Sequence, residues 1–292
     1  MSNQEEGVSR TADGRIAAIH EDQIANHAAE LRADPTFRMA EPVSFRPNPE
    51  SIKLSKHNEF IFAVDAEVFA DKGTGIVEWP YHDFLAAAHP RTIIGQRAVL
   101  EKDQRYRQFL PYTMVTQLKD GKTHFATYHR TKLVGEEKLA GKVSVGWGGH
   151  PDIADLVTGS FVEESITNPG SLSAPVSPVI NLYETLHRSN NREIVEELRL
   201  RDENGVVVDE ELATMASSLL ILDTDAVGLV HVGLVRHAFI SSTYTVECRE
   251  PELLYIGFRS AEELLSGDYD LEGWTRLYLE YFVRSGELTR VA

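Results

Sequence analysis

The chain has 292 residues, of which 42% are apolar and 25% are charged, and its formal net charge is −16. This composition is typical of a globular protein with a sizeable core and one or two domains. The acidic balance and the lack of a Lys/Arg cluster exclude an extended nucleic-acid surface. A small phosphorylated ligand still fits, because a bound divalent cation can reverse the sign of the local field.

The sequence lacks the features of a membrane-spanning or secreted chain. No run of about 18 apolar residues occurs, and the first residues, MSNQEEGVSRTADGR, lack the apolar core of a secretory signal. The single cysteine, Cys248, can form neither an internal disulfide nor a thiolate zinc site. We therefore expect a cytoplasmic protein with no membrane partner.

Residues 1–96 are expected to form an N-terminal extension. Residues 15–31 carry isoleucine and leucine at loosely helical spacing, which predicts one amphipathic helix after a polar, disordered start. Residues 60–70, FIFAVDAEVFA, are apolar and rich in β-formers and predict a strand. Residues 82–90 predict a short helix that ends near its proline.

A second domain is expected at residues 97–292. The Asp120-Gly121 pair between two β-rich runs predicts a hairpin, because its glycine tolerates the positive φ of a tight turn. Asn204-Gly205 marks another turn, and Ser260 with Glu263 forms a capping-box pattern at a helix start. The expected strands and helices lie at residues 105–118, 123–130, 217–223, 228–239, 252–258, 260–265 and 271–282. Since they mix without strict alternation, we expect an α+β fold.

The segment ETLHRSNNREIVEEL, residues 184–198, gathers carboxylates. If a helix starts with Thr185 as its N-cap, Glu193, Glu196 and Glu197 lie on one face. Their mutual repulsion costs roughly 0.2–0.5 kcal/mol per pair, and Mg²⁺ or Mn²⁺, which prefers hard oxygen ligands, would remove it. An ordinary solvated helix is the alternative, because Glu-rich helices are common.

The wider pattern resembles the Nudix box, G-x5-E-x7-R-E-U-x-E-E-x-G-U, in which U is a bulky aliphatic residue. Its two glycine positions hold Pro178 and Arg199 in this chain. The glycine-rich segment at residues 141–150 is similar to the strand and loop before a Nudix box, and an insertion at about residues 151–179 separates the two. With LPYTMV and VGLVHVGLV, the chain is similar to a bacterial and phage branch of predicted MutT-type phosphoesterases. The matching box positions are Glu184, Arg192, Glu193, Ile194, Glu196, Glu197 and Leu200.

The resemblance implies a mixed β-sheet sandwiched between helices and a metal-dependent hydrolase of the Nudix superfamily. Such enzymes cleave a pyrophosphate bond in a nucleoside diphosphate derivative or nucleotide. Glu193, Glu196 and Glu197 would hold Mg²⁺ or Mn²⁺. Glu184 would support the site, and Arg192 would hold a glutamate in place.

Basic and glycine residues near the box are candidates for substrate contact. Arg130 and Lys132, with Lys142 as a weaker candidate, could reach phosphate oxygens, and solvated surface cations are the alternative. Gly148 and Gly149 permit close approach of the backbone to a ligand or to the box helix. His150 could touch a phosphate or relay a proton, or it could be a loop histidine bonded to the backbone. His231 and His237 are expected on one face of a strand as ordinary strand residues.

Two other functions stay open. The altered box glycines, Pro178 and Arg199, are compatible with a catalytically inactive Nudix-fold nucleotide sensor or interaction domain. A prenyl-diphosphate isomerase would need a catalytic cysteine, and Cys248 lies far beyond the box in no recognisable motif. Glu163 and Glu164 are open candidates for a general base. The partner is expected to be a small phosphorylated, nucleotide-like substrate, and a homodimer stays an open alternative because many superfamily members are dimers.

Overall fold

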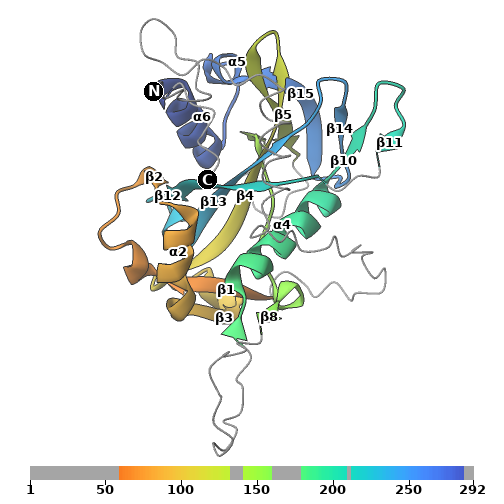
Figure 1. The fold of residues 1–292 in the computed structure, drawn as a ribbon. Helices are drawn as coiled ribbons and strands as arrows, with labels where there is room; N and C mark the ends of the chain where they lie inside the picture. Colours follow the sequence, from red (N-terminus) through yellow and green to blue (C-terminus); the bar gives the residue numbers. More distant parts are fainter. Residues whose placement is uncertain (1–58, 132–140, 160–178, 209–211, 286–292) are drawn as a thin grey trace, which may run out of the picture. The chain divides into compact units, whose positions relative to one another are not determined.

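The structure is a computed structural model that describes residues 59–131, 141–159, 179–208 and 212–285 (Figure 1). The helix expected at residues 15–31 lies outside the described residues. So do Lys132, Pro178 and the candidate bases Glu163 and Glu164. In the described ranges, no helix is both long and apolar enough to cross a bilayer.

The α+β expectation is confirmed by a mixed ten-stranded sheet with the order β15-β5-β4-β13-β12-β2. The central pair, β4 and β13, is parallel, and the other pairs in this sheet are antiparallel. Its strands are β1 (Phe60–Asp65), β2 (Gly75–Glu78), β3 (Thr92–Gln96), β4 (Tyr106–Lys119), β5 (Lys122–Arg130), β6 (Val143–Ser144), β7 (Gly146–Trp147), β12 (Met215–Leu222), β13 (His231–Phe239) and β15 (Leu253–Ser260).

Strands from the predicted N-terminal extension belong to the same sheet. β1 pairs with β3 and β4, and β2 pairs with β12 at the sheet edge. β2 and β3 were not expected from the sequence. Two smaller sheets join β11 (Val207–Val208), β10 (Leu198–Arg201) and β14 (Thr245–Cys248), and β8 (Thr158–Gly159) with β9 (Val179–Ile180).

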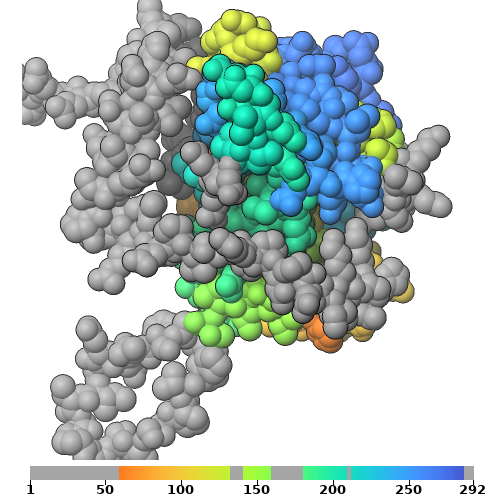
Figure 2. Space-filling view, turned by 90° about the vertical axis from the view of Figure 1, so that its right-hand side faces the viewer, coloured from red at the N-terminus to blue at the C-terminus, as the bar shows by residue number. Residues whose placement is uncertain are grey.

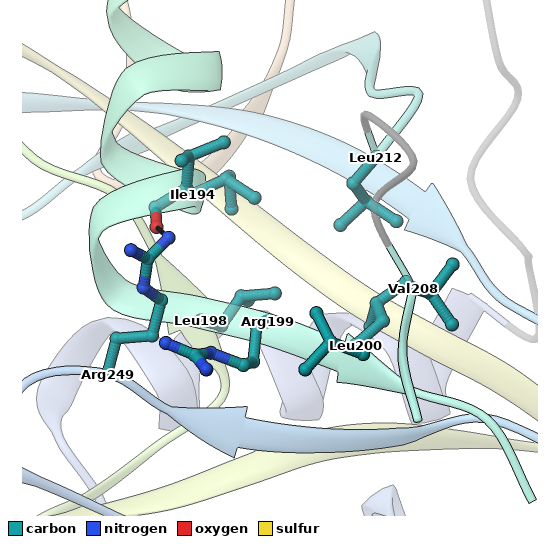
Figure 3. A pocket seen from close by; sticks show the side chains of 9 residues that line it. Ile194, Leu198, Arg199, Leu200, Val208, Leu212 and Arg249 are labelled. Atoms are coloured by element: carbon teal, nitrogen blue, oxygen red, sulfur yellow. Dashed lines mark hydrogen bonds between the residues drawn. The ribbon is translucent and has the colours of Figure 1, made fainter. Parts of the chain in front are cut away.

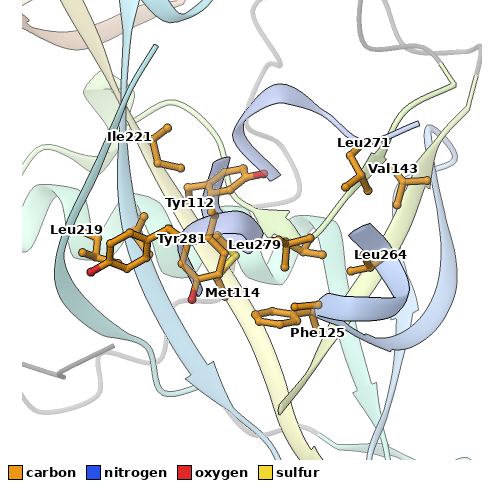
Figure 4. Close-up of a cluster of buried hydrophobic side chains, with 14 residues drawn as sticks. Tyr112, Met114, Phe125, Val143, Leu219, Ile221, Leu264, Leu271, Leu279 and Tyr281 are labelled. Atoms are coloured by element: carbon orange, nitrogen blue, oxygen red, sulfur yellow. The ribbon is translucent and has the colours of Figure 1, made fainter. Parts of the chain in front are cut away.

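Helices cover both faces of the main sheet. The side chains of β4 show this, because alternate residues of a strand point to opposite sides. Tyr112 and Met114 join a buried cluster with α5 (Ala261–Leu265) and α6 (Gly273–Ser285) (Figure 4). Phe109 and Val115 face the other side and join the clusters of α2 (Tyr81–Ala88) and α4 (Leu182–Glu197). The remaining short helices are α3 (Arg97–Leu100), η2 (Ala66–Phe69), η3 (His89–Arg91), η4 (Ile153–Asp155) and η5 (Gly228–Val230).

The local turn and cap predictions are confirmed. Asp120 and Gly121 have φ values of 52° and 72°, as a tight primed hairpin requires. Gly205 has φ 75° in the turn before β11. The Ser260 side chain accepts the Glu263 N–H at 3.2 Å, and the Glu263 carboxylate accepts the Ser260 N–H at 2.8 Å.

Two boundaries differ from the expectation. The strand expected through residue 70 ends at Asp65, whose carboxylate accepts the Glu67 N–H and starts η2. The box helix starts four residues earlier than expected, because Asn181 is its N-cap and accepts the Glu184 N–H at 3.1 Å. Thr185 is fully buried and its hydroxyl instead accepts the Val157 N–H.

Candidate active site

The candidate site lies where the C-terminal turn of α4 meets the loop after β7. Ile194 and Leu198 are 2% and 4% exposed and anchor this turn on the sheet. Leu198 has φ −137° and ψ 159°, so the helix changes directly into β10. This anchoring fixes the height and rotation of the glutamates on the last turn.

Two of these glutamates pack against a glycine pair. The Gly148 N–H donates to Glu197 Oε2 at 2.8 Å. Gly148 has φ +138°, and a Cβ there would lie 2.3 Å from the Pro111 carbonyl oxygen. A Cβ on Gly149 would lie 2.5 Å from the carboxyl carbon of Glu193. Residue 148 must therefore be glycine, whereas a side chain at residue 149 would have to displace the Glu193 carboxylate.

Arg192 links two glutamates of the expected metal set. Its Nη1 lies 2.8 Å from Glu193 Oε1 and 3.5 Å from Glu196 Oε2. The Glu193 side chain is 17% exposed and the Glu196 side chain is 38% exposed. The guanidinium therefore lies between an inner and an outer carboxylate of the same helix.

Asp155 holds the other edge of Arg192, a role that was not predicted from the sequence. Asp155 accepts from Arg192 Nε at 3.0 Å and from Nη2 at 2.9 Å, and Nη2 also donates to the His150 carbonyl at 3.1 Å. Asp155 is 2% exposed and forms a capping box with Asp152 in η4. The signal in the sequence was the D-x-x-D spacing just after the glycine loop.

The buried carboxylates resist ionisation when no cation neutralises them. Burial raises the pKa of Glu193 to about 7 against the opposing charge of Arg192. Burial, followed by the charge of Glu193, raises the pKa of Glu197 well above its usual range. A bound cation would remove this strain, since it favours the ionised form of both groups.

Arg130 is an internal ion-pair partner rather than a solvated cation. Its Nε lies 2.5 Å from Glu272 Oε1, and its Nη2 donates to the Tyr128 hydroxyl at 3.2 Å. Glu272 is 5% exposed and was not expected at the site. The positive charge of Arg130 opposes the rise in the pKa of Glu197. Lys142, the weaker candidate, pairs with Asp270 at 3.1 Å.

His150 pairs with His231, which was expected to be an ordinary strand residue. The Nε2 atoms of His150 and His231 lie 3.0 Å apart. His231 Nδ1 lies 2.7 Å from the Val227 carbonyl, which can only accept, so Nδ1 carries a proton. His231 lies near Trp274 and His237 near Tyr278, both of α6, so the two histidines share a face as expected.

Glu184 and Cys248 stand apart from this group. Glu184 lies in the first turn of α4, nine residues before Glu193, which is about 13 Å along the helix axis. Burial, followed by the charge of Glu197, raises the pKa of the Cys248 thiol to about 12. This thiol is therefore poorly suited to act as a nucleophile at neutral pH.

Arg199, at the altered glycine position of the box, lines a separate groove (Figure 3). The groove has a volume of about 280 Å³, and its floor is apolar. On its rim, Arg249 Nη1 donates to the Val195 carbonyl at 2.5 Å. Figure 2 shows the teal surface of β10 and β11 beside the blue surface of the later strands, as the pairing of β10 with β14 requires.

The carboxylate oxygens of the site are the donor type that a hard divalent cation prefers, but the three glutamates do not point to one common position. Within residues 59–285 as far as the structure describes them, no group of three or more His, Cys, Asp or Glu side chains could hold a metal ion. Glu193 and Glu197 nevertheless supply buried oxygen donors with raised pKa values. Glu196 is the most exposed of the three and would have to turn from Arg192 to join them.

Comparisons with known proteins give one curated relative and several solved structures. No protein-family model matches the chain. Protein YmaB from Bacillus subtilis (strain 168) is 24% identical over 187 residues, which are 63% of this chain and 75% of YmaB. At this identity the likeness assigns no activity to the chain.

The solved structures are similar at low identity. Tm1382, a candidate Nudix hydrolase, is 19% identical with a TM-score of 0.49, covering 78% of this chain and 100% of that one. The NUDIX hydrolase from Alicyclobacillus acidocaldarius is 14% identical with a TM-score of 0.37 (61% and 91% covered). The NUDIX domain of Shewanella oneidensis NrtR, complexed with ADP ribose, is 14% identical with a TM-score of 0.33 (62% and 89% covered). All three carry the name of the superfamily that the pattern at residues 184–200 resembles.

Proposed function

We propose that this protein is a metal-dependent hydrolase that cleaves a pyrophosphate bond in a nucleoside diphosphate derivative or nucleotide. One observation carries the proposal: Glu193 and Glu197 are buried against Gly148 and Gly149, where burial raises the pKa of both carboxyl groups. A pair of buried carboxylates beside Gly148 and Gly149 is better explained by a cation site than by a solvated helix face. The resemblance to the Nudix box supports the reaction class.

The residues of the chain then have distinct roles. Glu193, Glu196 and Glu197 would hold Mg²⁺ or Mn²⁺. The bound cation would neutralise phosphoryl oxygens and lower the pKa of a water molecule for attack. Arg192 orients Glu193 and Glu196, and the Gly148 N–H orients Glu197.

A buried positive charge, that of Arg130, acts on the carboxylate of Glu197. Arg130, fixed by Glu272, favours the ionised form of Glu197 and so prepares it to bind a cation. The His150–His231 pair adjoins the glycine loop and can carry a proton between its Nε2 atoms. Glu184 supports the start of the box helix at a distance from these groups.

The test is Mn²⁺ binding to wild type, Glu193→Gln and Glu197→Gln by calorimetry or electron paramagnetic resonance. Glu203→Gln is the matched control, because Glu203 is an exposed residue of the β10–β11 turn and loses the same charge. We expect the two site variants to lose at least about tenfold in affinity and the control to keep it. Equal affinity in all four proteins would refute the metal site.

A nucleotide sensor without turnover is the competing function. It is favoured by the position of Arg192 Nη1 between Glu193 and Glu196, where a cation would have to compete with it. A screen of nucleoside diphosphate derivatives with Mg²⁺ or Mn²⁺ separates the two functions. Product formation that Glu197→Gln abolishes supports the hydrolase, and tight binding without product supports the sensor.

A further inference from the structure

A buried arginine on the α2/α4 face of the sheet has incomplete hydrogen bonding. Arg236 of β13 is 2% exposed. Its Nη2 contacts His187 Nδ1 at 3.0 Å and donates to Thr214 Oγ1 at 3.1 Å. Its Nε and Nη1 are buried without a hydrogen-bond partner. Among the described residues, no carboxylate forms an ion pair with Arg236.

The groups around this guanidinium are neutral near pH 7. Burial, followed by the charge of Arg236, lowers the pKa of His187 to about 4, so its Nδ1 can accept the hydrogen bond. The Tyr81 hydroxyl is buried beside Arg236 without a hydrogen bond of normal geometry. Burial raises the pKa of Tyr81 to about 12, while the charge of Arg236 and a contact with its guanidinium oppose the rise. The cluster therefore keeps one positive charge without a carboxylate partner, and the Nε and Nη1 atoms of Arg236 lack well-formed hydrogen bonds.

Such an arrangement is costly without an anion. A buried charge is normally paired, and an unpaired one destabilises the folded state. Guanidinium N–H groups and a hydroxyl are donors that match the oxygens of a phosphate group. The structure holds the donors in place, because Asn190 donates to Thr214 at 3.1 Å and accepts from Thr113 at 2.6 Å.

The cluster lies next to a partly exposed edge formed by Tyr183 and His187 of α4. Tyr183 of α4 is 47% exposed and packs edge-on against Tyr81, with ring centroids 6.1 Å apart. It also stacks with His187 at 6.3 Å, and His187 is itself partly exposed. Tyr183 is held by ring contacts, whereas His187 also contacts Arg236 Nη2 at 3.0 Å and the Asn191 amide at 3.4 Å. Rotation of these two side chains would be needed for a ligand to reach Arg236.

This cluster is separate from the candidate active site. His187 and Glu193 are six residues apart on α4, which is about 9 Å along the axis and about 120° around it. Arg236 points to the α2/α4 face of β13, whereas His231 points to the α6 face. We propose that Arg236, Tyr81, His187 and Thr214 form a second site that binds phosphate or a phosphate monoester.

The proposal stands independently of the hydrolase function, and inorganic phosphate tests it. Thermal unfolding of metal-free wild type and Arg236→Met is followed from 0 to high phosphate, with potassium chloride holding the ionic strength constant. The wild-type midpoint should rise with the logarithm of phosphate concentration, because a ligand that binds only the folded state stabilises it. The Arg236→Met midpoint should not depend on phosphate.

The same variant distinguishes an anion site from a structural arginine. Without phosphate, Arg236→Met should unfold at the wild-type temperature or above it, because an apolar side chain of similar length removes an uncompensated charge. A strongly lowered midpoint together with equal phosphate dependence in both proteins would overturn the proposal. Binding only of an adventitious ion would appear as an equal effect of phosphate and chloride, and would also overturn it.

Tyr81→Phe keeps the test decisive if Arg236→Met does not fold. This change removes one donor and keeps the aromatic ring in its contacts with Phe84 and Tyr183. We expect a similar midpoint without phosphate and a several-fold weaker apparent phosphate affinity. An unchanged phosphate dependence in Tyr81→Phe would contradict the site.

Discussion

Asp155 and Arg192 are joined by two hydrogen bonds of 3.0 and 2.9 Å, across 37 residues of sequence. This pair ties η4 to the box helix and fixes the guanidinium that contacts Glu193 and Glu196. The position of the candidate metal ligands thus depends on a residue outside their own helix.

Asp155→Asn should therefore weaken Mn²⁺ binding about 10-fold or more, because groups that orient metal ligands affect affinity on that scale. Asparagine has the size of aspartate, but it is uncharged and its amide nitrogen donates, so it cannot accept both hydrogen bonds from Arg192. Calorimetry gives the affinity, and Asp152→Asn is the control, since asparagine also caps a helix start. If both variants bind Mn²⁺ equally well, Asp155 does not position the site.

Gly149→Ala should displace the Glu193 carboxylate and reduce Mn²⁺ affinity. A Cβ at residue 149 would lie 2.5 Å from the carboxyl carbon, well inside van der Waals contact. The displaced atoms are the end of a side chain, so the main effect should be on the position of the carboxylate rather than on the backbone. Gly73→Ala is the matched control, because a Cβ there meets nothing within 4 Å. Unaltered Mn²⁺ affinity in Gly149→Ala would show that the carboxylate can move without consequence.

Arg130→Met should destabilise the fold far more than Lys142→Met. The first change leaves Glu272 buried without its partner, which costs about 3–5 kcal/mol. The second breaks a pair in which Asp270 is 72% exposed, and such pairs contribute roughly 0–1 kcal/mol. Urea unfolding measures both values. Similar stability of the two variants would contradict the ion-pair role, and Arg130 would instead be a solvated cation or a direct phosphate contact.

His237 should make the fold sensitive to acid. It is 3% exposed, and burial lowers its pKa to about 4, below the ordinary value of 6.5. Its contribution is fully present above pH 6.5 and is lost as the pH falls toward 4, because the unfolded chain takes up the proton first. The loss reaches about 3 kcal/mol at pH 4.

Urea unfolding between pH 7 and pH 4.5 checks this dependence. His237→Gln, which does not titrate, should lose less stability over this range than wild type. His82→Gln is the control, because the His82 side chain is 95% exposed. A wild-type slope that His237→Gln does not reduce would assign the acid sensitivity to other groups.

The sequence predicted those features that depend on neighbouring residues. The Asp120-Gly121 hairpin and the Ser260–Glu263 capping box are set within four residues, and both are confirmed. The predicted start of α4 was wrong, because Thr185 and Asn181 are both residue types that cap helices well. The Thr185 hydroxyl accepts the Val157 N–H instead, and Asn181 caps the helix.

Features that depend on distant residues were not predictable in this way. Glu272 lies 142 residues from Arg130, so no local pattern marks it as a partner. β2 is a four-residue strand defined by its pairing with β12. The predicted box glutamates lie on one helix turn and do meet the glycine loop, but which oxygen contacts Gly148 depends on tertiary packing.

The direct junction between α4 and β10 limits how this chain can change in length. Leu198 is both the helix cap and the first residue of a strand paired with Cys248. One residue inserted after Glu197 would swap the two faces of β10, and one inserted before Glu193 would turn the carboxylates by about 100°. Insertions and deletions should therefore be tolerated at the Asp120-Gly121 turn and rejected at this junction, and a library of single-residue insertions would show the difference.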